Sequence, residues 1–212
     1  MRLVYLSPVP WGSFAQRPQR FVEWFHSRTA GDVLWVDPYP TRLPRLVGFL
    51  GANPNSRGAS PEVPTWLEIL TPRALPVEPL PVVNRINALL WREVFDRTSV
   101  FASEGPCWIG VGKPSQLALQ VLANVPGISF ISSFYDAMDD FPAFYSGWSR
   151  SAMKKNESRL LQRAGNVLAS SSTSLNRMRS SDREVTPVLN GCDINRLHFV
   201  SALPNRPARP VL

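Results

Sequence analysis

The sequence is poor in residues that bind metal ions or form disulfides. Its 212 residues include two cysteines and two histidines. Cys107 and Cys192 are far apart and show none of the short spacings of metal-binding motifs. We therefore expect no metal site, two packed thiols and a reducing, cytoplasmic compartment.

Long hydrophobic runs are also missing. No uninterrupted apolar stretch is long enough to span a bilayer, and no secretory signal peptide precedes the first expected strand. These absences predict a cytoplasmic protein whose contact with a membrane, where there is one, is peripheral and at the inner face.

Acidic residues are outnumbered by basic ones. Asp and Glu total 16 against 23 Lys and Arg, which gives a formal net charge of +7. A basic chain attracts nucleic acid, phosphorylated substrates or the anionic inner leaflet of a membrane, and the charge alone does not choose among them. We expect no nucleic-acid partner, because the basic residues are spread over several expected helices and no nucleic-acid-binding motif is present.

What the sequence does contain excludes a disordered chain. Hydrophobic residues make up 44% and there are seven tryptophans, enough for the core of one domain or of two small ones. Twenty-one prolines concentrate in 38–81 and 204–210. These clusters predict a long irregular excursion and a linker or tail.

Short β-type runs alternate with helical patterns along the chain. We expect strands at 2–6, 32–37, 65–70, 108–111, 128–131, 166–170 and 184–189. We expect helices from residue 18, at 84–97 with Asn84 as the cap, from residue 115, at 149–164 and at 175–179. The alternation predicts an α/β fold, with a doubly wound, mostly parallel Rossmann-like sheet and helices on both faces.

Residues 41–60 leave two interpretations open. Segment 42–50 mixes two arginines with five large apolar residues. It is interpreted either as a surface helix against the sheet or as a basic-apolar patch for a membrane surface.

An acidic stretch interrupts this basic chain. Asp136, Asp139 and Asp140 fall within five positions, shortly after the expected strand at 128–131. In an open α/β sheet, ligands bind at the carboxyl ends of the strands. We therefore expect these carboxylates to lie in a cleft. The loops expected to line it are 8–16, 112–115, 136–142, 170–173 and 190–193.

Several segments together resemble the N-terminal half of bacterial GT-B glycosyltransferases. They are Trp11 with Gln16-Arg-Pro-Gln19, Tyr135-Asp-Ala-Met-Asp-Asp-Phe-Pro142, 157–171, and Asn190-Gly-Cys-Asp193 with His198-Phe199. The resemblance is strongest to the glycogen-synthase-like retaining enzymes that build exopolysaccharide, teichuronic acid and other surface glycans. It covers nearly the whole chain.

The resemblance implies that residues 1–200 form a Rossmann-like acceptor-binding domain and that 201–212 lead toward a C-terminal donor domain absent from this sequence. That domain would hold the nucleotide-sugar, so no cofactor is expected here, and the chain alone is expected to be inactive. The implied reaction transfers a sugar to a surface-glycan or lipid-linked acceptor at the inner face of the cell membrane. The open alternative is a non-catalytic Rossmann-type module that binds a glycan or a nucleotide.

Asp136 is the candidate catalytic residue. Many relatives carry His-Asp at this point, and Tyr135-Asp136 stands there in this chain. Positive charge develops on the sugar as the donor phosphate leaves, so an anion beside it would stabilise the transition state. Tyr135, Asp139 and Asp140 are candidate acceptor-binding residues. The plainer interpretation of the last two is a turn cap or an arginine partner.

Two loops supply further acceptor-binding candidates. Gly12, Ser13 and Arg17 follow the first strand, where a glycine lets backbone amides approach ligand oxygens and a helix start favours an anion. The alternative is an ordinary loop with a solvated arginine. Lys113 either faces a phosphate or carboxylate in the cleft or is a surface lysine.

The last part of the chain contains the expected domain crossing. Asn190 and Gly191 are the candidate hinge, since glycine tolerates the backbone angles that such a crossing needs. The serine-rich segment 170–174 is interpreted as a strand end and helix cap rather than a phosphate site.

Overall fold

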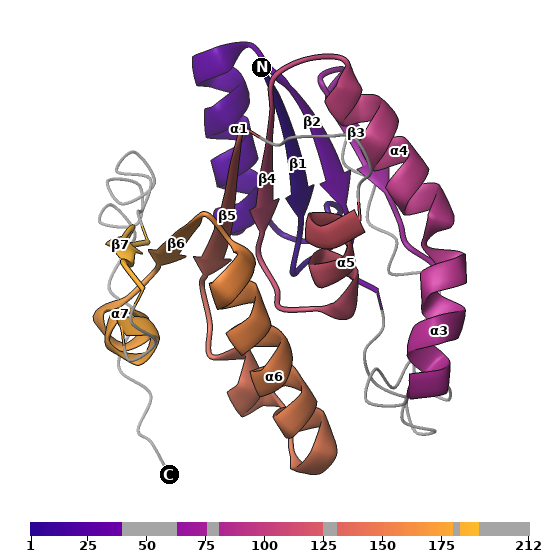
Figure 1. Cartoon of the computed structure of the whole chain (residues 1–212). Coiled ribbons are helices and arrows are strands. Elements are labelled where there is room, and N and C mark those ends of the chain that lie inside the picture. Colours follow the sequence, from indigo (N-terminus) through magenta and orange to yellow (C-terminus); the bar gives the residue numbers. More distant parts are fainter. Residues whose placement is uncertain (40–62, 76–80, 125–130, 180–182, 191–212) are drawn as a thin grey trace, which may run out of the picture.

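Seven parallel strands form a single sheet in the computed structural model of this chain (Figure 1). Their order across the sheet is β3-β2-β1-β4-β5-β6-β7, and each neighbouring pair is parallel. The structure describes residues 1–39, 63–75, 81–124, 131–179 and 183–190. The predicted doubly wound, Rossmann-like α/β fold is confirmed.

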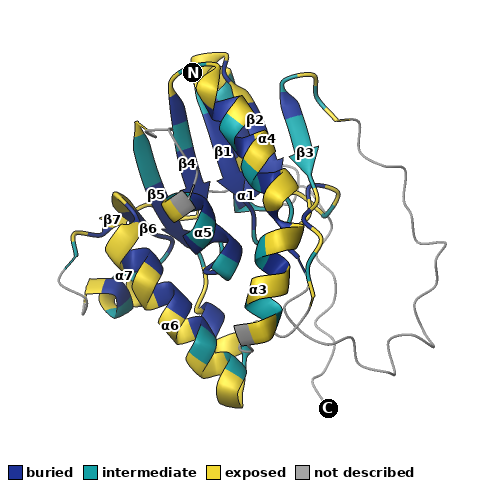
Figure 2. Cartoon of the chain, turned by 45° about the vertical axis from the view of Figure 1, so that its right-hand side comes forward, coloured by how far each residue is buried: buried dark blue, intermediate teal, exposed yellow. Residues whose placement is uncertain are grey.

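The strands are short, and the central ones are buried on both faces. They are β1 (Arg2–Leu6), β2 (Asp32–Val36), β3 (Leu67–Leu70), β4 (Cys107–Val111), β5 (Ser132–Ala137), β6 (Asn166–Ala169) and β7 (Thr186–Pro187). Residues 3–6 of β1 and 33–36 of β2 are all buried, as expected for parallel strands covered on each side. Figure 2 shows these dark blue strands between the helices.

Helices lie against both faces of the sheet. They are α1 (Arg17–Thr29), α3 (Pro81–Leu90), α4 (Arg92–Ser103), α5 (Gln116–Asn124), α6 (Gly147–Arg163) and α7 (Ser172–Arg179), with a short 3₁₀ helix, η1 (Phe141–Phe144), before α6. Helix α1 covers one face, and α4, α5 and α6 cover the other (Figure 1). None of the helices described combines the length and the apolar character that crossing a bilayer requires.

Two apolar clusters hold these layers together. On the α1 face, Tyr5 stacks on Trp35 at a ring-centroid distance of 5.5 Å, and Trp11 meets Trp35 edge-on at 5.1 Å. On the other face, mostly aliphatic side chains pack between the sheet and its helices, together with the fully buried Trp91. Because burying one large apolar side chain contributes roughly 1.5–3 kcal/mol, both faces stabilise the sheet.

Strand β5 lies later in the chain than predicted. The apolar run 128–131 predicts a strand, but its last residue, Ile131, is 61% exposed, and the strand spans Ser132–Ala137. Tyr135 and Asp136 therefore lie within the strand and not in the loop after it. The Tyr135 side chain fills the core, and a partner from another element makes the buried Asp136 tolerable, so the strand extends over both.

The helix predicted at 84–97 is interrupted. Trp91 separates α3 from α4, is fully buried and has φ −87° and ψ 1°. Asn84 lies inside α3 and not at its cap, because the helix already begins at Pro81, whose fixed φ suits a first helical turn. Helix α6 begins at Gly147 and α7 at Ser172, both earlier than predicted, and β7 is shorter than predicted.

Some predictions fall outside the described residues. They are the two interpretations of 41–60, the start of the strand expected at 128–131, the hinge residue Gly191, the packed thiol of Cys192 and the linker 201–212.

Gly110 in β4 provides a test of packing across the sheet. A Cβ atom at this position would lie 2.5 Å from the Phe134 ring and 2.8 Å from the Tyr5 ring. We expect Gly110→Ala to lower the free energy of unfolding by about 1–3 kcal/mol, as overpacked cores do. Urea unfolding followed by circular dichroism measures this change.

Gly105→Ala is the matched control for that substitution. Nothing lies within 4 Å of a Cβ atom at Gly105, so we expect little change there. An equal loss of stability in the two variants would contradict close packing at Gly110.

Candidate functional site

The carboxyl ends of the strands lie along one edge of the sheet. Because the strands are parallel, the segments that follow them emerge at that edge, where Figure 1 shows the arrow tips. Strand β1 pairs with β2 on one side and with β4 on the other. The chain therefore adds β2 and β3 on one side of β1 and then crosses over to add β4 and the later strands on the other side. Open α/β sheets bind ligands at such a switch point.

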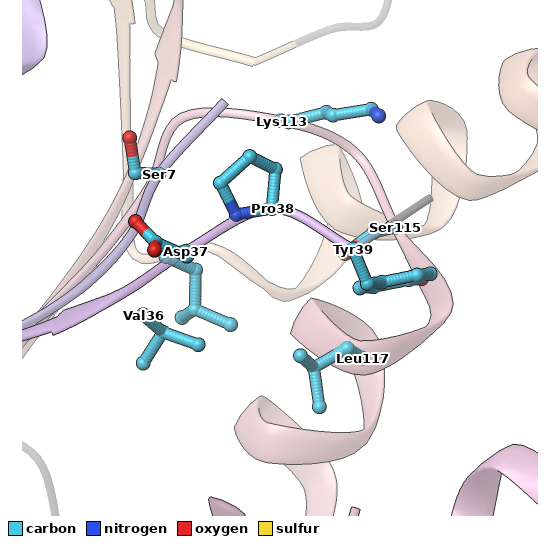
Figure 3. Close-up of a pocket in the computed structure, with 9 residues that line it drawn as sticks. Ser7, Val36, Asp37, Pro38, Tyr39, Lys113, Ser115 and Leu117 are labelled. Carbon is cyan, nitrogen blue, oxygen red and sulfur yellow. The ribbon is translucent and has the colours of Figure 1, made fainter. Parts of the chain in front are cut away.

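A small pocket lies at this switch point (Figure 3). Its lining comes from the ends of β1, β2 and β4 and the start of α5, and its polar side chains include Ser7, Asp37, Lys113 and Ser115. Figure 3 shows the amino group of Lys113 directed away from the Asp37 carboxylate. The pocket volume of about 20 Å³ accepts a water molecule but not a sugar ring.

Asp37, directly after β2, fixes the loop that follows β1. Its Oδ1 accepts hydrogen bonds from the Trp11 backbone amide at 3.0 Å and from the Trp35 indole at 2.8 Å. Its Oδ2 accepts a third from Thr71 Oγ1 at 3.2 Å. The carboxylate therefore joins the first loop to β2 and to the segment after β3.

Gly12 and Ser13 lie in this first loop. Gly12 is exposed. Ser13 Oγ donates a hydrogen bond to the Pro10 carbonyl at 2.8 Å and accepts one from Gln19 Nε2 at 3.2 Å. The buried Gln19 also accepts the Gln16 backbone amide through Oε1 at 3.0 Å. The loop is thus tied to the start of α1, and the Ser13 hydroxyl is engaged within the protein.

Arg17, the first residue of α1, reaches Asp136 in β5. Its Nε and Nη2 atoms donate to the two carboxylate oxygens at distances of 2.9, 3.0 and 3.2 Å. The Asp136 side chain is 2% exposed and the Arg17 side chain 18%. A buried carboxylate costs free energy unless a hydrogen-bonded cation accompanies it. Arg17 is therefore what makes an aspartate tolerable inside the sheet.

The same guanidinium holds the end of the described chain. Nη1 donates to the Val188 carbonyl at 2.7 Å and to Asn190 Oδ1 at 3.2 Å. Arg17 therefore connects α1 with β5 and with the segment after β7. Asn190, one of the two candidate hinge residues, follows β7 and is held in place by this arginine.

Burial changes the acid–base properties of this cluster. Loss of hydration raises the pKa of Asp136, and the hydrogen bonds and positive charge of Arg17 oppose that rise. Tyr5 is fully buried nearby, and burial together with the Asp136 charge raises the pKa of its phenol well above the ordinary value. The Tyr5 hydroxyl itself has no hydrogen-bond partner among the described residues.

Tyr135 points to the opposite face, because side chains alternate along a strand. It is fully buried, and its hydroxyl donates to Glu157 Oε1 at 2.9 Å. Glu157, buried in α6, also accepts hydrogen bonds from Arg177 of α7 at 2.6 and 3.1 Å. Burial raises the pKa of Tyr135, and the negative charge of Glu157 adds to the rise.

Arg177 extends from this second network to the acidic segment after β5. Its Nη2 donates to the Asp139 carbonyl at 3.3 Å, and Nη1 lies 3.7 Å from Asp140 Oδ1. The Asp139 side chain is exposed, and that of Asp140 is 51% exposed. Segment 136–140 is therefore held on both faces of the sheet, by Arg17 on one and Arg177 on the other.

The structure brings some of the predicted site residues together and separates others. Arg17, Asp136 and Asn190 form one cluster. Asp139 and Asp140 lie with Arg177, as the plainer interpretation of Asp140 anticipated. The remaining candidates are Lys113 at the switch-point pocket, Gly12 and Ser13 in the first loop, and Tyr135 in the core. Contact of these residues with a ligand stays a prediction.

Three residues that shape the edge are missing from the sequence-based candidates. Asp37 carries a usable signal, since an acidic residue directly after a buried strand needs a partner. Glu157 and Arg177 carry none, because nothing local indicates that α6 and α7 meet behind Tyr135. The cap interpretation of the serine-rich segment is confirmed, since Ser171 Oγ accepts the Ser174 backbone amide at 3.1 Å.

Among the residues that the structure describes, no histidine lies at the carboxyl edge of the sheet. His26 stacks on Trp66 at a centroid distance of 4.4 Å, with Nδ1 2.9 Å from the Gly31 carbonyl, near the amino ends of the strands. His198 lies outside the described residues. Within those residues, no group of three or more His, Cys, Asp or Glu side chains could hold a metal ion.

Arg17→Met tests how strongly the arginine anchors its three partners. It leaves the buried Asp136 carboxylate without its cation, so we expect the free energy of unfolding to fall by about 3 kcal/mol, measured by urea unfolding. Arg20→Met is the matched control on the same helix. Arg20 is exposed and pairs with Glu23, so its loss should cost under about 1 kcal/mol.

A second readout of Arg17→Met follows the chain after β7. We expect limited chymotrypsin digestion to cleave beside Leu189 faster in this variant than in the wild type, because Val188 and Asn190 lose their donor. Equal cleavage rates would show that Arg17 does not hold this segment.

Asp136 gives the protein a specific pH dependence. Because burial raises its pKa in the folded state, the folded chain binds more protons than the unfolded chain above the ordinary value of about 3.9. Its contribution to stability is fully present below that value and is lost as the pH rises through the raised one. We expect the free energy of unfolding of the wild type, minus that of Asp136→Asn, to decrease along that rise. A difference that increases would mean that Arg17 outweighs burial.

Comparison with protein-family models and with curated proteins finds no match for this chain. The contacts at the carboxyl edge and the resemblance of the sequence segments are therefore the basis for a function.

Proposed function

We propose that this chain is the acceptor-binding N-terminal domain of a GT-B glycosyltransferase. The complete enzyme would transfer a sugar from a nucleotide-sugar to a surface-glycan or lipid-linked acceptor at the inner face of the cell membrane. The donor would lie on a second domain, so the chain alone is expected to be inactive. The acceptor would meet the carboxyl edge of the sheet.

The observation that carries this proposal is the fixed acidic segment 136–140. Arg17 and Arg177 hold it from opposite faces of the sheet, while the carboxylates of Asp139 and Asp140 face solvent. Carboxylates accept hydrogen bonds from sugar hydroxyls, and these charge-assisted bonds are stronger than neutral ones. A fixed pair at the ligand-binding edge therefore suits a sugar acceptor better than an anion.

The first βα turn supports an acceptor domain over a nucleotide site. A dinucleotide-binding turn uses several glycines and free helix amides to approach a diphosphate. Here the loop contains Pro8 and Pro10, and Pro18 removes an amide from the first turn of α1. Gln19 also takes the Gln16 amide. The diphosphate of a nucleotide-sugar is thus better placed on another domain.

Asp136 would influence the reacting sugar indirectly, through Arg17 and the acidic segment. Both of its carboxylate oxygens are occupied by Arg17. We therefore propose that it positions Arg17 and the acidic segment, and that direct contact with the sugar would require this ion pair to open.

One observation favours the alternative, a non-catalytic Rossmann-type module for a glycan or a nucleotide. The switch-point pocket contains Ser7 and Lys113 beside the start of α5, where small phosphorylated ligands bind in other open α/β sheets. Its size admits water alone in this conformation, so the module would have to open to accept a nucleotide.

Saturation-transfer-difference NMR on the chain tests these proposals with two sets of probes. One set is short glycans such as maltotriose and cellobiose, and the other is UDP and GDP. We expect signals from a glycan, and we expect Asp139→Asn combined with Asp140→Asn to weaken its binding at least about tenfold, since each lost charge-assisted bond is worth about 1.5–3 kcal/mol.

Asp32→Asn combined with Glu104→Gln is the matched control. It removes the same charge from half-exposed carboxylates beside Arg2 at the amino edge, so glycan binding should persist. Signals from the nucleotides with none from the glycans would contradict an acceptor domain and support the nucleotide-binding module. An equal loss of glycan binding in the two double variants would show that the acidic segment is not part of the binding site.

A further inference from the structure

Helix α3 presents apolar side chains outward. Four of them lie on one stripe and are 40–66% exposed: Val82, Ile86, Leu89 and Leu90. The polar Asn87 is instead fully buried, and its amide bonds the backbone amide and carbonyl of Leu75 at 2.7 and 3.1 Å. This is the reverse of the usual pattern of a helix that faces water.

A second exposed apolar group lies at the start of α6. Trp148 is 83% exposed and Phe144, at the end of η1, is 57% exposed. Gly147 between them has φ +54°, a left-handed conformation that glycine adopts readily. Large aromatic side chains this exposed are uncommon on a surface that meets only water and often mark an interaction site.

The exposed ionisable residues of helices α3 and α6 are of one sign, unlike Asp139 and Asp140, which precede η1. The exposed ionisable residues of α6 are all basic: Arg150, Lys154, Lys155, Arg159 and Arg163. Its one acidic residue, Glu157, is buried against Arg177. Helix α3 contains a single ionisable residue, the exposed Arg85. Both helices therefore combine exposed apolar groups with positive charge.

Both helices project from the same end of the molecule. Figure 1 shows α3 and the first turns of α6 extending past the arrow tips of the strands, and Figure 2 shows the same arrangement from another direction. This is the end at which the carboxyl edge and its acidic segment lie. We call α3, η1 and residues 147–155 of α6 the α3–α6 surface.

We propose that the α3–α6 surface docks on an anionic lipid bilayer. The valine, isoleucine, leucines, tryptophan and phenylalanine would enter the interfacial region, and the lysines and arginines would remain among the acidic headgroups. The docking itself follows from this surface. Its purpose, bringing the acceptor edge to a lipid-linked sugar, rests on the proposed function.

A bilayer fits this surface better than a nucleic acid does. Positive charge attracts both partners. Bases stack on aromatic rings, however, and gain little from an aliphatic stripe, whereas an interfacial site uses aliphatic and aromatic groups together. The stripe on α3 contains only aliphatic side chains, so the lipid surface is the occupant that uses every part of the α3–α6 surface.

Sedimentation with vesicles measures the docking. We expect the wild-type chain to bind vesicles of phosphatidylcholine and phosphatidylglycerol in equal parts, and to bind pure phosphatidylcholine much more weakly. Lys154→Glu combined with Lys155→Glu should reduce the partition coefficient at least about tenfold, since each basic residue near an anionic surface contributes roughly fivefold. Trp148→Ala combined with Phe144→Ala should also reduce it at least about tenfold.

Matched variants on α1 separate this surface from overall charge and apolarity. Arg20→Glu combined with Arg28→Glu changes the net charge by the same amount, and Trp24→Ala removes a half-exposed tryptophan. We expect both to bind vesicles like the wild type. Quenching of tryptophan fluorescence by brominated phosphatidylcholine should be reduced in Trp148→Phe and unchanged in Trp24→Phe.

The proposal is overturned by any of three results. These results are a wild type that binds no anionic vesicles, α1 variants that lose binding as much as the α3–α6 variants, and binding of single-stranded RNA through these residues in place of vesicles. Glycan binding by NMR is measured on the same variants. A wild-type chain that binds glycans but no anionic vesicles would overturn the docking and leave the proposed function standing. A chain that binds vesicles but no glycans would do the reverse.

Discussion

The ion pair between Arg17 and Asp136 is the interaction on which the carboxyl edge depends. A carboxylate inside a seven-stranded sheet requires a cation with matched geometry, and the first residue of α1 supplies it. The same guanidinium bonds the chain after β7. One side chain therefore fixes the entry to the first helix, the end of β5 and the exit of the chain relative to one another.

A second arginine completes the support of this edge from the other face. Tyr135, Glu157 and Arg177 form a network behind β5, and Arg177 continues to the backbone of Asp139. A ligand-binding group is most effective when its supports are rigid. With both faces of β5 tied, the exposed carboxylates after it are presented from a fixed base, and the α3–α6 surface lies at the same end of the molecule.

Much of the fold was predictable because periodicity reports burial directly. Strands β1, β2 and β4 are short β-type runs between turn signals, and they lie where these patterns place them. The shift of β5 to Ser132–Ala137 was not predictable, because an aspartate looks like the end of a strand until its partner is known. The break at Trp91 was missed for a similar reason: helical spacing continues through it, and only packing shows that this side chain enters the core.

The sequence by itself determined a parallel α/β sheet, a basic chain and an acidic segment near the carboxyl end of one strand. These follow from local patterns of apolar residues, turns and charge. Only the tertiary structure decided that Arg17 meets Asp136, that Glu157 and Arg177 stand behind Tyr135, and that α3 buries Asn87 and exposes its aliphatic stripe. Each of these depends on contacts between residues distant in the chain, and local sequence does not specify which distant side chain will compensate a buried charge.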